Sequence, residues 1–203
     1  MSSAPPQLYS VEQYKTFLGA SEERLEYYRG EIFAMSGGTP DHAKIAWNIN
    51  AMLHTQLRGK ACQGFGADLS IKVRDDQYTF ADALVVCDEP RYEHGGVTSV
   101  TNPKTIFEVL SPSTEKYDRG AKFESYKSIA SFTDYLLVSQ YEPKIEHHRR
   151  DAAGGWSSTT VVGLEATLDL PSIGCRLSLS EVYERIEFYD PLGPRRFPVR
   201  GEE

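Results

Sequence analysis

Two runs of strand-forming, mostly apolar residues, each with one carboxylate near an end, constrain this chain most strongly. The first run extends from Thr79 to Val86 and contains Asp82, and the second extends from Thr105 to Leu110 and contains Glu108. Burying a carboxylate among apolar side chains is costly unless it is paired or binds a cation. If the two strands are neighbours, both carboxylates can lie at the same end of one sheet.

A lysine follows these carboxylates, because Lys122 lies in the first turns of a helix predicted after Asp118. Carboxylate oxygens suit Mg²⁺, whose octahedral shell is completed by phosphate and water, and a lysine can neutralise phosphate charge. The residues therefore predict a site for a divalent metal and a phosphate. The plainer alternative is that each carboxylate caps a turn outside the sheet and that the lysine lies on a helix surface.

Length and composition set the class of protein. The 203 residues suit one domain at 1–188, followed by a proline-containing tail at 189–203. The formal net charge of −7 disfavours a general nucleic-acid binder, which usually presents a basic face. We expect a cytoplasmic protein, because no apolar run reaches the roughly 20 residues that span a bilayer and the polar N-terminus lacks a signal-peptide core.

Other kinds of site lack sequence support. Cys62, Cys87 and Cys175 are far apart and have no metal-ligand spacing, which predicts reduced, mostly buried thiols and no structural zinc. The chain has no glycine-rich nucleotide-binding motif and no nucleophilic-serine elbow. His42 near a helix N-terminus could contact phosphate or transfer a proton, although a histidine there more often packs or caps.

Hydrophobic periodicity predicts the elements. Ser10 and Gln13 form a capping box for a helix over 11–18, and Asp41 is the predicted cap of a helix over 42–58. Further helices are predicted over 118–129 and 178–185, and residues 88–103 are predicted to form a loop. The predicted strands are 24–28, 31–35, 63–74, 78–87, 105–110, 134–138, 145–149, 158–162 and 167–170. This order indicates an α/β or α+β domain with a mixed central sheet and a helix on each face.

The motifs together resemble those of the Uma-two family, a bacterial group classed with restriction endonucleases in the PD-(D/E)XK nuclease superfamily. The resemblance covers residues 9–184 and is most specific from Glu108 to Lys122. The matching positions are Arg24, Glu26, Gly30, Glu31, Ile32, Asp41-His42-Ala43, Asp82, Glu108-Val109-Leu110-Ser111-Pro112-Ser113-Thr114 and Tyr117-Asp118-Arg119-Gly120 with Lys122.

The resemblance implies a restriction-endonuclease-like fold and Mg²⁺-dependent hydrolysis of nucleic-acid phosphodiester bonds, with Mn²⁺ as a substitute and DNA as the expected partner. Asp82 and Glu108 would be catalytic metal ligands. Lys122 would replace the lysine that the superfamily carries two residues after the glutamate, where this chain has Leu110.

Three further expectations come with the resemblance. Glu31 would assist as a catalytic residue, while Glu26 and His42 are weaker candidates. Double-strand cleavage needs two sites, so a homodimer is expected by analogy. The alternative function is a catalytically inactive DNA-binding or protein-interaction module with the same fold, which the acidic net charge and Leu110 favour.

Overall fold

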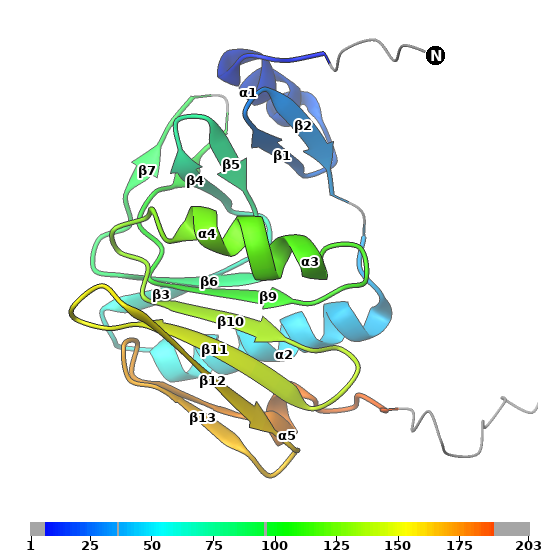
Figure 1. Ribbon diagram of the computed structural model, residues 1–203, viewed down its shortest axis with the longest axis vertical. Coiled ribbons are helices and arrows are strands. Elements are labelled where there is room, and N and C mark those ends of the chain that lie inside the picture. The colour runs from blue at the N-terminus through cyan, green and yellow to red at the C-terminus, as the bar shows by residue number, and fades with distance from the viewer. Residues whose placement is uncertain (1–6, 36, 96, 189–203) are drawn as a thin grey trace, which may run out of the picture.

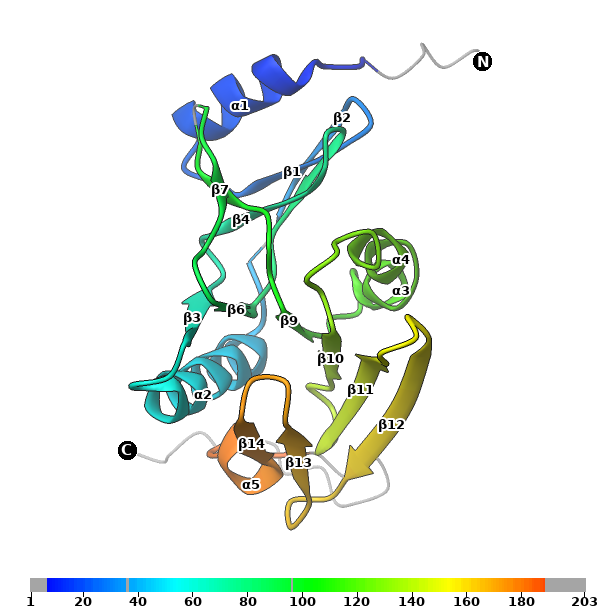
Figure 2. The ribbon, with the colours of Figure 1, turned by 90° about the vertical axis from the view of Figure 1, so that its left-hand side faces the viewer.

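A central sheet, covered by helices on both faces, organises the chain (Figures 1 and 2). The computed structural model describes residues 7–35, 37–95 and 97–188. Within that part of the chain, no helix combines the length and the apolar character that a bilayer crossing requires. The predicted tail at 189–203 lies outside the described residues.

The central sheet has the strand order β12-β11-β10-β9-β6-β3. β9 and β10 run parallel and the other neighbours run antiparallel, so the sheet is mixed as predicted. The middle strands are rich in Val, Leu, Ile and Phe because both of their faces are buried. The strands are β3 (Cys62–Gly66), β6 (Ala83–Cys87), β9 (Thr105–Val109), β10 (Asp134–Val138), β11 (Lys144–Arg150) and β12 (Trp156–Val162).

Different helices cover the two faces of this sheet (Figure 2). α2 (Pro40–Leu57) packs its apolar stripe on one face, and β13 (Thr167–Leu170), β14 (Cys175–Ser178) and α5 (Leu179–Val182) complete that layer. The other face is covered by α3 (Glu115–Tyr117), the π-helix η1 (Asp118–Lys122) and α4 (Phe123–Tyr126). The predicted arrangement of a helix on each face is therefore confirmed.

A second sheet, of order β2-β1-β5-β4-β8-β7, lies beside the first (Figure 1). Its hairpin turns at Arg29 and Gly30, whose positive φ values of 48° and 94° suit a tight hairpin turn. α1 (Val11–Ala20) packs against this sheet and begins with the predicted capping box. The strands are β1 (Leu25–Tyr28), β2 (Glu31–Ala34), β4 (Ser70–Arg74), β5 (Gln77–Thr79), β7 (Tyr92–Glu93) and β8 (Ser99–Val100).

Glu93 of β7 bonds to side chains of α1, β4 and β5. We therefore expect its removal to lower the stability of the fold by an amount that depends on pH. Glu93 accepts hydrogen bonds from Lys15 at 2.5 Å, from Tyr78 at 2.6 Å and from Lys72. Burial raises its pKa, but these donors outweigh burial and hold the pKa at about 2. Because the folded pKa is depressed, the stabilisation is present above the unfolded value of 4.5 and is lost as pH falls toward 2.

We therefore expect Glu93→Gln to lower the free energy of unfolding by about 2–3 kcal/mol at pH 7, and by progressively less between pH 5 and pH 2. Urea titrations of both proteins across that range measure the difference. Glu142→Gln is the control, because Glu142 is exposed and, in the part of the chain that the structure describes, pairs only with Lys144. A deficit that stays constant with pH would contradict the assignment.

The predictions of single strands over 63–74 and 78–87 are wrong, because each range contains two strands. Residues 63–74 form β3 and β4, and residues 78–87 form β5 and β6, with each pair divided between the two sheets. The apolar run from Thr79 to Val86 continues across the second break, and the first break is marked only by Gly66-Ala67-Asp68, so the sequence does not show that the chain passes from one sheet to the other at these points. The second break places Asp82 between two strands rather than within one.

Three local predictions also need correction. Thr39, not Asp41, caps α2, and its side chain accepts the N–H of His42 at 3.1 Å. The helical segment predicted to begin at Asp118 begins at Glu115, so Asp118 lies inside it and is buried. The predicted loop over 88–103 contains the short strands β7 and β8.

The cysteine prediction is wrong for one pair. Cys62 and Cys87 face each other across β3 and β6 and form a disulfide, whereas Cys175 is buried with a free thiol. Strand register brings the pair together over a separation of 25 residues, which spacing in the sequence does not reveal.

Candidate active site

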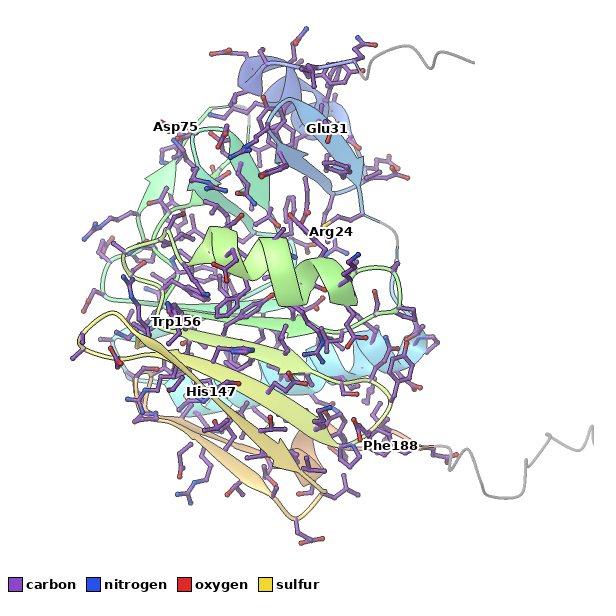
Figure 3. All side chains as sticks on the ribbon, in the orientation of Figure 1. Arg24, Glu31, Asp75, His147, Trp156 and Phe188 are labelled. Carbon is purple, nitrogen blue, oxygen red and sulfur yellow. A yellow bond between two sulfur atoms is a disulfide. The ribbon has the colours of Figure 1, made fainter. Side chains whose placement is uncertain are left out.

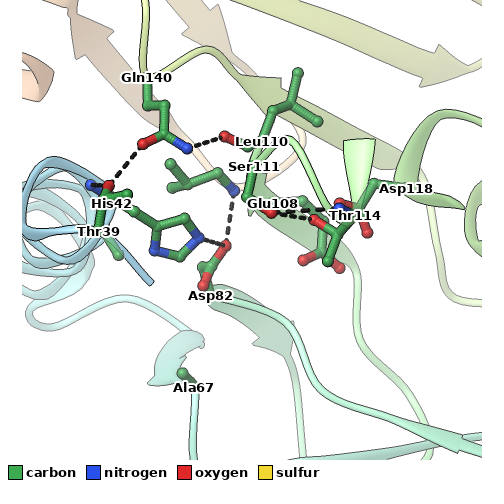
Figure 4. A network of polar contacts seen from close by, with 12 residues as sticks. Thr39, His42, Ala67, Asp82, Glu108, Leu110, Ser111, Thr114, Asp118 and Gln140 are labelled. Atoms are coloured by element: carbon green, nitrogen blue, oxygen red, sulfur yellow. Dashed lines mark hydrogen bonds and ion pairs between the residues drawn. The ribbon is translucent and has the colours of Figure 1, made fainter. Parts of the chain in front are cut away.

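Asp82 lies where the chain passes from β5 to β6 (Figure 4). Its backbone N–H donates to the carbonyl of Phe107 at 3.2 Å, which anchors it beside β9. Its Oδ2 accepts the N–H of Val109 at 2.7 Å and lies 3.4 Å from Nε2 of His42. Asn50 of α2 donates to the carbonyl oxygen of Asp82 at 3.2 Å. The carboxylate is therefore fixed by groups from two elements.

Glu108 lies inside β9, with its side chain in the layer between the sheet and α4. Its Oε1 accepts from the hydroxyl of Tyr126 at 3.1 Å and from Nζ of Lys122 at 2.9 Å. Glu108 is 5% exposed and Lys122 is 3% exposed, so their ion pair is closed off from bulk water. The predicted proximity of Lys122 to Glu108 is thus present in the structure.

Lys122 belongs to η1, a π-helical turn of five residues. π-helices are rare, and in other proteins they occur mostly as single turns, often at functional sites. Besides Glu108, the ammonium group lies 3.6 Å from Oε1 of Glu26 and 3.6 Å from Oδ1 of Asp118. The three carboxylates and one ammonium group leave an excess of two negative charges if all are ionised.

Glu26 reaches this cluster from the second sheet. Its Oε1 also accepts the hydroxyl of Thr79 and the N–H of Phe80, so it ties β1 to the end of β5. Asp118 is 2% exposed, and its carbonyl accepts the hydroxyl of Tyr135 at 3.0 Å. The sequence alone makes Glu26 only a weak candidate, and its predicted helix begins at Asp118 without indicating that this side chain is buried.

Burial and the excess negative charge together shift the titration of the cluster. Burial, together with the charges of Asp118 and Asp82, raises the pKa of Glu108 well above its usual range, although Lys122 opposes the shift. Burial likewise raises the pKa of Asp118, again against Lys122. Burial lowers the pKa of Lys122, but Glu108 and the other carboxylates outweigh it and raise the pKa above the usual value, so the lysine stays protonated.

His42 completes the neighbourhood of Asp82. Burial lowers the pKa of His42, but its contact with Asp82 outweighs burial and raises the pKa. The positive charge of Arg24 acts in the opposite direction. Arg24 donates to the carbonyl of Ala67 at 3.2 Å, and within the described residues it forms no ion pair.

The chain matches a known protein family along most of its length. Residues 11–180 match the Uma2 family model, which is described as "Putative restriction endonuclease". This chain belongs to the Uma2 family. The family predicted from the motifs, as Uma-two, is therefore confirmed.

Two relatives of this Uma2 protein come from Synechocystis sp. and are uncharacterized proteins. The first is 35% identical over 189 residues, which is 92% of this chain and 97% of the relative. The second is 26% identical over 170 residues, which is 83% of this chain and 96% of the relative. Neither name supplies an activity.

A solved structure shares the fold of this Uma2 protein. It is a crystal structure of "a putative nuclease belonging to DUF820" from Anabaena variabilis, with a TM-score of 0.66. At 18% identity, the match covers 80% of this chain and 91% of that chain. The predicted mixed α+β class and restriction-endonuclease-like fold are confirmed.

Leu110 and Glu31 are the two remaining positions that the family resemblance singles out. Leu110, which occupies the usual lysine position, is buried with the apolar residues beneath α4, so among the described residues Lys122 alone supplies an ammonium group next to Glu108. Glu31 lies on the β1–β2 hairpin, toward α1, whereas Glu26 of the same hairpin reaches Lys122 (Figure 3). The catalytic role predicted for Glu31 stays a prediction.

Proposed function

We propose that this protein is a metal-dependent nuclease that hydrolyses phosphodiester bonds, with DNA as the expected substrate and Mg²⁺ or Mn²⁺ as the cofactor. The observation that carries the proposal is the buried contact between Lys122 and Glu108 close to Asp82. The family description, together with the nuclease name of the Anabaena variabilis structure, supports a nuclease in general terms.

The donor set fits a hard divalent cation. Oδ1 of Asp82 and Oε2 of Glu108 have no hydrogen-bond partner among the described residues, while the other oxygen of each carboxylate is held. In the described part of the chain, no three histidine, cysteine or carboxylate side chains converge to hold an ion by themselves. Mg²⁺ needs only one or two carboxylates, because phosphate and water complete its shell.

A cation bound there would polarise the scissile phosphate and lower the pKa of an attacking water. The chain's own residues do the positioning. Lys122 contributes a fixed positive charge for the phosphate oxygens, and Glu26 and Asp118 hold its side chain in place. The excess of carboxylates favours cation binding, because a cation relieves their mutual repulsion.

Plasmid cleavage with Mg²⁺, with Mn²⁺ and with a chelator tests the proposal. We expect wild type to cut only with metal, and Asp82→Asn to lose at least about tenfold in rate, because asparagine keeps the oxygen but loses the charge. The matched control is Asp169→Asn, since Asp169 is exposed and its one ion pair within residues 7–35, 37–95 and 97–188 is with Arg176 at the surface. Equal rates for wild type and Asp82→Asn would overturn the site.

The same assay distinguishes the other candidate function, a nuclease-fold module that binds without cutting. Its supporting observation is that Lys122 is 3% exposed and surrounded by carboxylates, which can be a purely structural arrangement. DNA binding without cleavage under every metal condition would favour that module. Cleavage of both strands at one position would favour the proposed homodimer, because each copy carries one site.

A further inference from the structure

The two oxygens of Asp82 have unequal surroundings (Figure 4). Oδ2 receives the Val109 N–H and the His42 contact, whereas no donor from the described residues reaches Oδ1. A carboxylate held at only one oxygen presents the other to a ligand. The side chain is 17% exposed, so Oδ1 is available without being fully solvated.

His42 is placed by a chain of hydrogen bonds rather than by its own capping role. Thr39 caps α2 and donates its hydroxyl to Oε1 of Gln140 at 2.6 Å, and Nε2 of Gln140 donates to the carbonyl of Leu110 at 2.6 Å. Gln140 is 6% exposed, so both of these hydrogen bonds are largely shielded from water. These hydrogen bonds connect the first turn of α2 to Leu110, two residues after Glu108. The cap uses only the backbone N–H of His42, so its imidazole ring is free for another task.

Gly38 makes room for that ring. A Cβ atom at position 38 would lie 2.8 Å from Nδ1 and 2.9 Å from Cγ of His42, which is closer than real Cβ atoms approach other atoms. A Cβ atom at the adjacent Gly37 would meet nothing within 4 Å. Two neighbouring glycines in one loop therefore differ sharply, and only Gly38 is needed for the position of the imidazole.

We infer that His42 is a positioning residue for Asp82, that it holds Oδ2 so that Oδ1 is the ligand atom, and that Gly38 exists to admit the imidazole ring. The role of Oδ1 as a cation ligand rests on the proposed function. The positioning of Asp82 by His42 does not depend on the proposed function.

Gly38→Ala and its matched control Gly37→Ala test the inference in the metal-free protein. We expect Gly38→Ala to shift the imidazole ¹⁵N–¹H correlations of His42 and to speed hydrogen exchange at the Val109 amide, while Gly37→Ala changes neither. Titration with Mn²⁺ should then show about tenfold weaker binding for Gly38→Ala only. Identical spectra and Mn²⁺ affinity for the two alanine variants would overturn the inference.

Substitutions at His42 separate positioning from a general packing effect. His42→Gln keeps a donor of similar reach and should retain most Mn²⁺ affinity, whereas His42→Ala should lose as much as Gly38→Ala does. Adding Gly38→Ala to His42→Ala should cause no further loss, because the ring it displaces is gone. A further loss, or full Mn²⁺ affinity in His42→Ala, would overturn the inference.

Thermal melts of all variants identify any that do not fold. If Gly38→Ala or His42→Ala does not fold, the spectra and Mn²⁺ affinities of Gly37→Ala and His42→Gln still test the inference. If wild type neither binds Mn²⁺ nor cuts DNA, the proposed function fails. The metal-free spectra still decide whether His42 positions Asp82.

Discussion

Replacing Lys122 by methionine should reduce cleavage by about 10³-fold and lower the free energy of unfolding by about 3–5 kcal/mol at pH 7. The variant keeps the length of the side chain and removes its charge. Glu108, Asp118 and Glu26 would then be left around an apolar group, with Glu108 and Asp118 almost wholly buried. Rate and stability fall together because one ammonium group serves both.

The pH dependence of that loss has a definite sign. Lys122 opposes the upward shift in the pKa of Glu108, so the pKa rises further when the lysine is removed. A carboxyl whose folded pKa lies above its unfolded value destabilises the fold most at high pH, and this cost fades as pH falls and the group protonates. The stability deficit of Lys122→Met should therefore be larger above the pH at which Glu108 protonates in the variant than below it, as urea titrations over a range of pH can measure.

Lys116→Met is the matched control, because Lys116 is exposed in the same helical segment and has no ion-pair partner among the described residues. Its stability should stay within about 0.5 kcal/mol of wild type and its cleavage rate should be unchanged. Lys122→Arg restores the positive charge and should recover part of the lost stability. A Lys122→Met protein that cuts DNA within threefold of the wild-type rate would remove Lys122 from the mechanism.

The sequence revealed features whose signals are local. The apolar runs located β6 and β9, and helical spacing located α2 and its buried face, because each depends on periodicity within one element. The prediction that Asp82, Glu108 and Lys122 form a site is also local, because it depends on charges placed next to apolar residues. Such reasoning identifies groups that need partners.

The partners themselves depend on how distant segments meet. Glu26 enters the cluster because β1 pairs with β5, and Cys62 meets Cys87 because β3 pairs with β6. Gln140 reaches Thr39 across 101 positions of the chain. No local pattern encodes these registers, so the sequence could name Glu108 and Lys122 but could not favour Glu26 over Glu31.

Those two glutamates provide the sharpest remaining comparison. Glu26→Ala should reduce cleavage by about 10²-fold and stability by about 2–4 kcal/mol, because Thr79 and Phe80 lose their buried acceptor and Lys122 loses one carboxylate that holds it. The same cleavage assay and urea titrations measure both effects.

Glu31→Ala is the natural control, since it removes the same side chain from the same hairpin. Glu31 is half-buried, and its carboxylate has no hydrogen bond or ion pair within the described residues. From these missing contacts we expect its stability to change by less than about 0.5 kcal/mol and its cleavage rate by less than twofold, whereas the role implied by the family resemblance predicts a loss of cleavage. If Glu31→Ala instead abolished cleavage while Glu26→Ala did not, the acidic residue that serves the site would be the one implied by family resemblance. The cluster around Lys122 would then be a structural feature of the fold, and catalysis would have to depend on Asp82, Glu108 and a hairpin that moves toward them.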